Sequence, residues 1–145
     1  RLAREGRGLA FANGIARVEA GLAVAETRAG RIALLTRGPD GAPARAGEIA
    51  VPGGPDNLTV APDGRLVAAL HPSLPRLAFY RHGWTEAAPA RIVAVEPRTG
   101  AVEPLWDDPD GALLPGATVG VLTEDGALVA GSVRAGGLLV CGAAP

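Results

Sequence analysis

The sequence contains three copies of one short pattern, and an internal repeat constrains a fold more strongly than any single residue does. Each copy begins with a polar residue, continues through mostly apolar positions to a glycine turn that follows an acidic residue, and ends in an apolar strand. The copies span residues 13–26, 57–70 and 118–132. Short strands repeated at intervals of this size are typical of the blades of a β-propeller.

A further short apolar stretch follows each copy after a turn, and we expect each stretch to be a strand. These stretches are residues 30–36, 75–80 and 136–141. Residues 91–105 add another pair of strands to the second repeat. Helical periodicity is weak throughout, and the 21 glycines and 13 prolines are typical of a chain rich in turns. The sequence therefore predicts an all-β chain with about three blades. The expected blades cover residues 9–50, 51–105 and 112–145.

Three blades do not close a ring, because propellers need roughly four to eight of them. A three-repeat solenoid fits less well, since polar residues at the start of the innermost strands suit a water-filled central channel. We therefore expect this chain to be the C-terminal half of a six-bladed β-propeller, with the N-terminal half as its missing partner. Alone, the chain should associate through its open strand edges.

The overall composition excludes some classes of partner. The formal net charge is −1, which gives no electrostatic reason to expect nucleic acid or an anionic membrane. No apolar run reaches the roughly 18 residues that a membrane-spanning helix needs. The wealth of alanine, glycine, arginine and proline is typical of a high-GC bacterium, and leaves open whether the compartment is the cytoplasm or the periplasm.

Side-chain oxygens lead two of the three repeats and are candidates for binding a metal ion. Asn13 begins the first copy and Asn57 the second, and Asp56 directly precedes Asn57. Equivalent positions of successive blades point toward one axis, so these side chains should meet at one mouth of the channel. Neutral oxygens with one acid suit Ca²⁺, which takes roughly six to eight oxygen ligands. The alternative is that all three residues only form turns, as Asn and Asp often do.

His71 is the candidate general base. It follows the second strand of its repeat, so the chain has run down one strand and back along the next, and His71 should return near Asn57. The unperturbed pKa of histidine suits proton transfer near neutral pH. The alternative is a histidine that merely lines a loop. Cys141, the single cysteine, is either a buried thiol or half of a disulfide with a partner outside this chain.

Taken in order, these residues resemble the paraoxonase/arylesterase branch of the calcium-dependent superfamily that also holds gluconolactonase and the senescence marker protein. The resemblance covers nearly the whole chain, from Phe11 to Cys141. It rests on residues 11–15, 25–26 with 31–32, 56–57 with Val60, 71–72, 79–80, 116–119 and 138–141.

The resemblance implies a six-bladed propeller with two Ca²⁺ ions in its tunnel, one structural and one catalytic, and hydrolysis of lactones or aryl esters. In this family the catalytic Ca²⁺ acts as a Lewis acid on the substrate carbonyl. By position, Asn13, Asp56 and Asn57 match ligands of the catalytic calcium, and His71 matches a histidine that lines the same pocket. Thr118 and Val119 match residues of the pocket wall. Cys141 matches a cysteine that forms a disulfide near the N-terminus in the animal members.

The chain also departs from the family pattern. The remaining calcium ligands, among them a glutamate, are absent, and so are a histidine pair proposed as the base and most ligands of the structural calcium. We therefore expect this chain alone to be an incomplete enzyme. Two other functions are consistent with the fold: a non-catalytic propeller that binds a ligand or serves as a scaffold, and a metal-free protein similar to strictosidine synthase. The combination of Asn13 with Asp56 and Asn57 favours the hydrolase, because a metal-free protein has no need of it.

Overall fold

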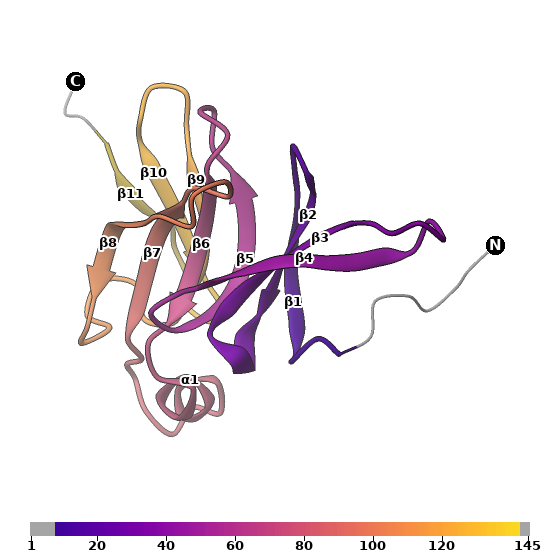
Figure 1. Ribbon diagram of the computed structural model, residues 1–145. Helices are drawn as coiled ribbons and strands as arrows, with labels where there is room; N and C mark the ends of the chain where they lie inside the picture. The colour runs from indigo at the N-terminus through magenta and orange to yellow at the C-terminus, as the bar shows by residue number, and fades with distance from the viewer. Residues whose placement is uncertain (1–7, 143–145) are drawn as a thin grey trace.

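The computed structural model describes residues 8–142, which fold into three antiparallel β-sheets (Figure 1). The first sheet has the strand order β1-β2-β3-β4, and a short 3-10 helix, η1 (Thr27–Ala29), joins β2 to β3. Each strand pairs with the next one along the chain. The four strands are β1 (Ala12–Val18), β2 (Gly21–Glu26), β3 (Arg31–Arg37) and β4 (Pro43–Ala50).

The second and third sheets repeat this meander. In the second sheet the order is β5-β6-β7-β8, and in the third sheet β10 lies between β9 and β11. The second sheet consists of β5 (Gly54–Val60), β6 (Leu66–His71), β7 (Ala90–Val95) and β8 (Val102–Asp108). The third consists of β9 (Ala117–Leu122), β10 (Leu128–Ser132) and β11 (Leu139–Cys141). The prediction of an all-β chain is confirmed.

One predicted strand is wrong. Residues 75–80 lie in the helix α1 (Leu74–Arg81), which is inserted between β6 and β7. The side chain of Ser73 caps this helix by accepting a hydrogen bond from the backbone N–H of Arg76, and a proline in the first turn suits a helix start. Leu77 and Tyr80 then face the protein interior from one side of the helix. The apolar run reads as a strand because it is short; the serine and proline before it are the signal for a helix.

The sheets stack face to face, and two apolar cores lie between them. We call the face of a sheet that points toward the preceding sheet its A-face, and the opposite face its B-face. The first core joins the B-face of the first sheet to the A-face of the second. Its main side chains are Ala16, Ala23, Ala25, Ile32 and Ile49 from the first sheet, and Leu58, Leu66, Ala68, Leu70, Val93 and Val95 from the second.

The second core joins the B-face of the second sheet to the A-face of the third. Its main side chains are Val67, Ala69, Ala90 and Ile92 from the second sheet, and Ala117, Leu128 and Ala130 from the third. Successive residues of β6 and β7 alternate between the two cores, as the two faces of a strand require. The second sheet is therefore covered on both faces, whereas each outer sheet is covered on one.

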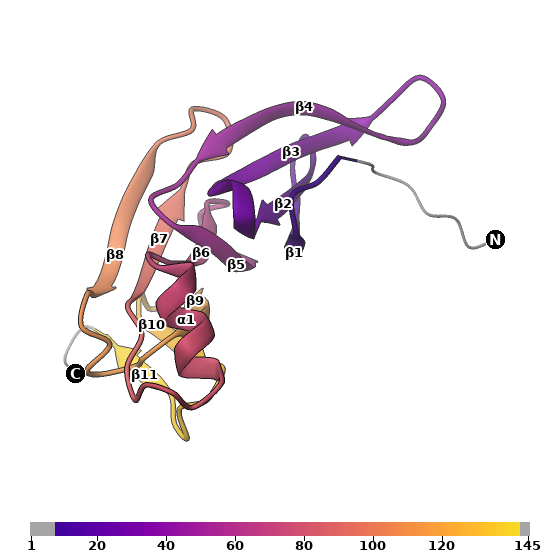
Figure 2. The same ribbon diagram turned by 90° about the horizontal axis from the view of Figure 1, so that it is seen from below.

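The first strands of the three sheets lie next to one another. β5 contacts both β1 and β9, and Figure 2 shows the ends of these strands from below. A Cβ atom on Gly14 would lie 2.4 Å from the carbonyl oxygen of Asp56 and 2.6 Å from the backbone nitrogen of Leu58. On the other side of β5, the Thr59 hydroxyl donates to the Gly120 carbonyl oxygen at 2.6 Å. We call β1, β5 and β9 the starting strands.

No helix within residues 8–142 is long and apolar enough to cross a membrane.

We expect Gly14→Ala to destabilise the protein by about 1–3 kcal/mol, since a methyl group there overlaps the backbone of β5. The measurement is the free energy of unfolding from urea denaturation at a fixed protein concentration. Gly136→Ala is the matched control, because a Cβ atom at Gly136 meets no other heavy atom within 4 Å. Equal stability of the two variants would contradict the close approach of β1 to β5.

Candidate functional site

Each starting strand has an irregularity at the same place in its repeat. The pairing of β1 with β2 shifts register between Ala12 and Ile15, and that of β5 with β6 shifts between Pro55 and Leu58. In the third sheet, the shift leaves Thr118 without a partner on β10. A β-bulge changes the direction in which side chains point and often lies next to a functional site. Asn13, Asp56, Asn57 and Thr118 are the residues in or beside these bulges.

Asn57 links the second sheet to the third through its side-chain amide. Its Nδ2 donates to the backbone carbonyl oxygen of Thr118 at 3.0 Å. A carbonyl oxygen can only accept, so this contact fixes which end of the amide points toward β9. The Oδ1 of Asn57 then faces away from β9, and Asn57 itself is exposed.

A short relay of hydrogen bonds fixes the amide of Asn13 in the same way. The buried Thr27 hydroxyl donates to the carbonyl oxygen of Pro55 at 2.7 Å, which uses its only hydrogen. Thr27 Oγ1 therefore accepts from Nδ2 of Asn13, at 3.3 Å. The Oδ1 of Asn13 is left without a donor among the described residues. Both amides thus use their nitrogen to join neighbouring sheets and keep their oxygen available.

Asp56 and His71 form a pair at the end of the second sheet. Nε2 of His71 lies 2.9 Å from Oδ2 of Asp56. The His71 ring is 1% exposed, and its Nδ1 is buried with no hydrogen-bond partner within residues 8–142. A neutral ring protonated on Nε2 satisfies both observations best, because Nε2 then donates to the carboxylate and Nδ1 carries only a lone pair.

The predicted site residues therefore lie at one end of neighbouring strands. Asn57 is bonded to the backbone of Thr118, and Gly14, which follows Asn13, packs on the backbone at Asp56 and Asn57. Thr118 and Val119 are half-buried, and whether they form a pocket wall stays a prediction. So does the role of His71 as a general base.

The chain leading into this end is held in a rare backbone conformation. Phe11, two residues before Asn13, has a φ of 61°, which is uncommon for a residue other than glycine. Two hydrogen bonds flank it: the Ala10 N–H donates to Glu26 Oε1 at 2.7 Å, and the Thr27 N–H donates to the Phe11 carbonyl at 3.2 Å. Glu26 therefore helps to place Asn13.

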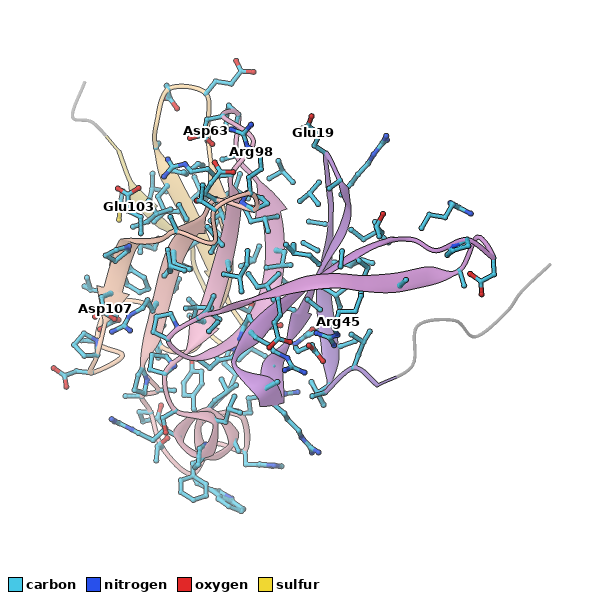
Figure 3. The ribbon with its side chains drawn as sticks, in the orientation of Figure 1. Glu19, Arg45, Asp63, Arg98, Glu103 and Asp107 are labelled. Atoms are coloured by element: carbon cyan, nitrogen blue, oxygen red, sulfur yellow. The ribbon has the colours of Figure 1, made fainter. Side chains whose placement is uncertain are left out.

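Glu26 is an ionised carboxylate with no exposure to solvent. Its Oε2 accepts from Arg31 at 2.7 Å and from Arg45 at 3.0 Å, and both arginines also contact the half-exposed Glu48. Burial raises the pKa of Glu26, but the hydrogen bonds from Arg45, Arg31 and the Ala10 backbone outweigh this and lower the pKa to about 2. Figure 3 shows Arg45 on β4 pointing into this cluster.

Sequence reasoning did not assign roles to Thr27 and Glu26. Thr27 follows β2 as His71 ends β6, and each is bonded to a predicted metal ligand of its own repeat. Alignment of the repeats is the signal that could have found Thr27. Burial of Glu26 has no comparable signal, because its arginine partners come from two other strands.

The donor set of the site consists of one carboxylate and two amide oxygens. No cluster of three or more His, Cys, Asp or Glu side chains suited to a metal ion occurs in the described part of the chain. The candidate ligands Asn13, Asp56 and Asn57 are hard oxygen donors, which suit Ca²⁺. Cys141 is half-buried on β11 beside the second core and, as the single cysteine of the sequence, has no disulfide partner within the chain.

A cleft of about 870 Å³ lies between the first two sheets, at the opposite end of the strands. Its lining includes Glu19, Asp63 and Arg98, which Figure 3 shows at the tips of the hairpins. Because none of the candidate ligands lines this cleft, it is separate from the candidate site.

No protein-family model matches this chain, and a search of the curated proteins found no match. The resemblance to the paraoxonase branch therefore remains a prediction from the residues themselves.

We expect Glu26→Gln to lower the free energy of unfolding at neutral pH, because it leaves Arg31 and Arg45 without their buried anion. The folded pKa of about 2 lies below the ordinary 4.5, so the stability from ionised Glu26 is present above pH 4.5 and is lost as pH falls toward 2. The gap between the wild type and Glu26→Gln should therefore shrink over that interval in urea denaturation. The exposed Glu86→Gln is the control, and a gap that is independent of pH would contradict the assignment.

Proposed function

We propose that this chain supplies three blades of a six-bladed β-propeller, and that the end of the starting strands binds Ca²⁺ in a hydrolase of lactones or aryl esters. The observation that carries the proposal is the orientation of the two amides. Asn13 and Asn57 both donate through nitrogen, so both oxygens remain available beside the Asp56 carboxylate.

Two features support a propeller over an open stack of sheets. The three sheets are sequential antiparallel meanders whose starting strands lie together, as the innermost strands of blades do. The two outer sheets each have one uncovered face that carries apolar side chains, among them Ile15 and Val140. Further blades would cover those faces.

The donor chemistry fits calcium. Ca²⁺ prefers oxygen ligands, takes roughly six to eight of them and accepts irregular geometry. Asn13, Asp56 and Asn57 provide three protein ligands, and the remainder would come from the other blades, water and substrate. When bound, Ca²⁺ would polarise the substrate carbonyl and stabilise the negative charge that develops on its oxygen.

The protein groups around the ligands would keep the oxygens in place. Thr27 and the Thr118 carbonyl oxygen hold the nitrogens of the two amides, and His71 donates to Asp56. These contacts restrict the rotation of each ligand side chain, and residues of this kind typically contribute roughly 10- to 100-fold to metal affinity or activity.

The burial of His71 favours a positioning role over direct proton transfer. Its Nε2 is occupied by Asp56, and its Nδ1 points into the protein. Since a general base must reach the attacking water, His71 would act on the reaction through the carboxylate it holds. The same burial supports a second candidate function, a calcium-dependent binding module without catalysis, because none of the candidate residues is then an exposed base.

In the complete propeller, we expect Asn57→Ala to weaken Ca²⁺ binding by at least about tenfold and to abolish the hydrolysis of phenyl acetate and of a simple lactone. The measurements are calorimetric Ca²⁺ titration and the initial rate of hydrolysis. Thr118→Val is the control, since it keeps the backbone oxygen that accepts from Asn57. Hydrolysis that persists in a calcium chelator would refute the proposed mechanism, and Ca²⁺ binding without hydrolysis would favour the binding module.

His71→Ala and His71→Gln separate the two roles of His71. If His71 positions Asp56, the alanine variant should lose roughly 10- to 100-fold in calcium affinity or activity, and glutamine should restore part of it by donating to the carboxylate. Calcium titration and the ratio kcat/KM give the readout. If both variants lose activity equally while calcium affinity is unchanged, His71 is the general base.

A further inference from the structure

We propose that a second copy of this chain completes the ring, so that two chains form one six-bladed propeller with twofold symmetry. The inference rests on the propeller fold of the proposed function, but not on calcium binding or hydrolysis. It follows from the two uncovered sheet faces, which have the same relation to each other as the faces that already pack within the chain.

Packing within the chain always joins a B-face to the A-face of the following sheet. The repeats show which positions do this. Leu66 and Leu128 are equivalent, and both lie in a core on the A-face of their sheet. Ala23 and Val67 are also equivalent, and both lie in a core on a B-face.

The A-face of the first sheet is uncovered. Ile15, Leu22 and Leu35 alternate with the residues of the first core and therefore lie on this face. Ile15 is 60% exposed, and the other two are half-buried. Leu22 occupies the repeat position of Leu66 and Leu128, which are buried. The first sheet thus presents the side chain that the other two sheets bury against a preceding sheet.

The B-face of the third sheet is uncovered as well. Val121 and Val140 both pair with Val129, so the three form one row across β9, β10 and β11. Val121 is 41% and Val140 65% exposed. Leu138 lies on the same face, beside Gly131, and is 70% exposed. Val129 occupies the repeat position of the buried Val67. This face is the apolar counterpart of the A-face of the first sheet.

The charges at the hairpin tips are complementary between these two faces. Arg17 is exposed near the tip of the β1–β2 hairpin, and Glu124 is exposed at the tip of the β9–β10 hairpin. Figure 1 shows both tips at the same end of the molecule. Neither residue forms an ion pair with any part of residues 8–142. Stacking the third sheet of one copy on the first sheet of the other brings opposite charges to the same edge.

Two such contacts, related by a twofold axis, close the assembly. Each copy contributes its third sheet to one contact and its first sheet to the other, so six sheets form a ring. Closure also places two sets of Asn13, Asp56 and Asn57 around one axis. These six protein ligands reach the range of roughly six to eight that Ca²⁺ requires, which a single chain does not.

Analytical ultracentrifugation of the whole chain in a calcium chelator tests the inference. We expect a species of twice the 14.5 kDa of one chain. Ile15→Glu changes the open A-face and Val121→Glu the open B-face, and each should shift the protein to the mass of one chain. Trp84→Glu is the control: Trp84 is 71% exposed and follows α1, which lies beyond the ends of the sheets in Figure 1. Far-ultraviolet circular dichroism verifies that each variant is folded.

A charge exchange provides a second test that does not place a charge within an apolar face. Arg17→Glu and Glu124→Arg should each weaken the pair by up to about tenfold, and the double variant should restore the wild-type affinity, since surface ion pairs contribute roughly 0–1 kcal/mol each. A double variant no tighter than the single ones would contradict the arrangement.

A wild-type protein with the mass of one chain, or of more than two, would overturn the inference. So would a pair that persists when either face carries the glutamate. These outcomes differ from failure of the proposed function. A pair that forms in chelator but neither binds Ca²⁺ nor hydrolyses esters leaves the ring intact and refutes the hydrolase. Binding of Ca²⁺ by a species of one chain mass refutes the pair and keeps the calcium site.

Discussion

β1 passes so close to β5 that a Cβ atom on Gly14 would lie 2.4 Å from the carbonyl oxygen of Asp56. Glycine permits this approach because it has no side chain to exclude the neighbouring backbone. The contact fixes the distance between the first two sheets at the end where their bulges lie. Since the bulges carry Asn13, Asp56 and Asn57, the candidate ligands are positioned by the packing of the starting strands, and no direct bond between the ligands is needed.

Hydrogen bonds between sheets complete this positioning. Thr27 receives the amide of Asn13 and passes its own hydrogen to the second sheet, whereas Asn57 reaches from the second sheet to the third. The Glu26 cluster on the A-face of the first sheet acts from farther away, by holding the backbone that leads into Asn13. A buried carboxylate is favourable there only because two arginines and a backbone N–H surround it. Polar contacts thus set the orientation of the site, and apolar stacking holds the sheets together.

The two open faces connect stability with the proposed activity. A sheet with one face in water is normal for an antiparallel structure, but the exposed face is then usually polar. Here the uncovered face of the third sheet carries Val121, Leu138 and Val140, which is typical of an interaction surface. The same contact that buries this face would also bring further oxygens to the end of the starting strands. Assembly and completion of the metal site are therefore a single event in the proposed ring.

The sequence by itself determined the all-β class, the three repeats and the end of the strands at which the polar residues gather. These features are local: alternation of apolar residues and glycine turns depends only on neighbouring positions. It did not determine α1, because the helix start at Ser73 competes with a short apolar run. Only the tertiary structure decided that His71 is buried against Asp56, that Glu26 is ionised between Arg31 and Arg45, and which atoms of the two amides remain available. Each of these depends on side chains that are distant in sequence, whose distances and burial are fixed only when the sheets stack.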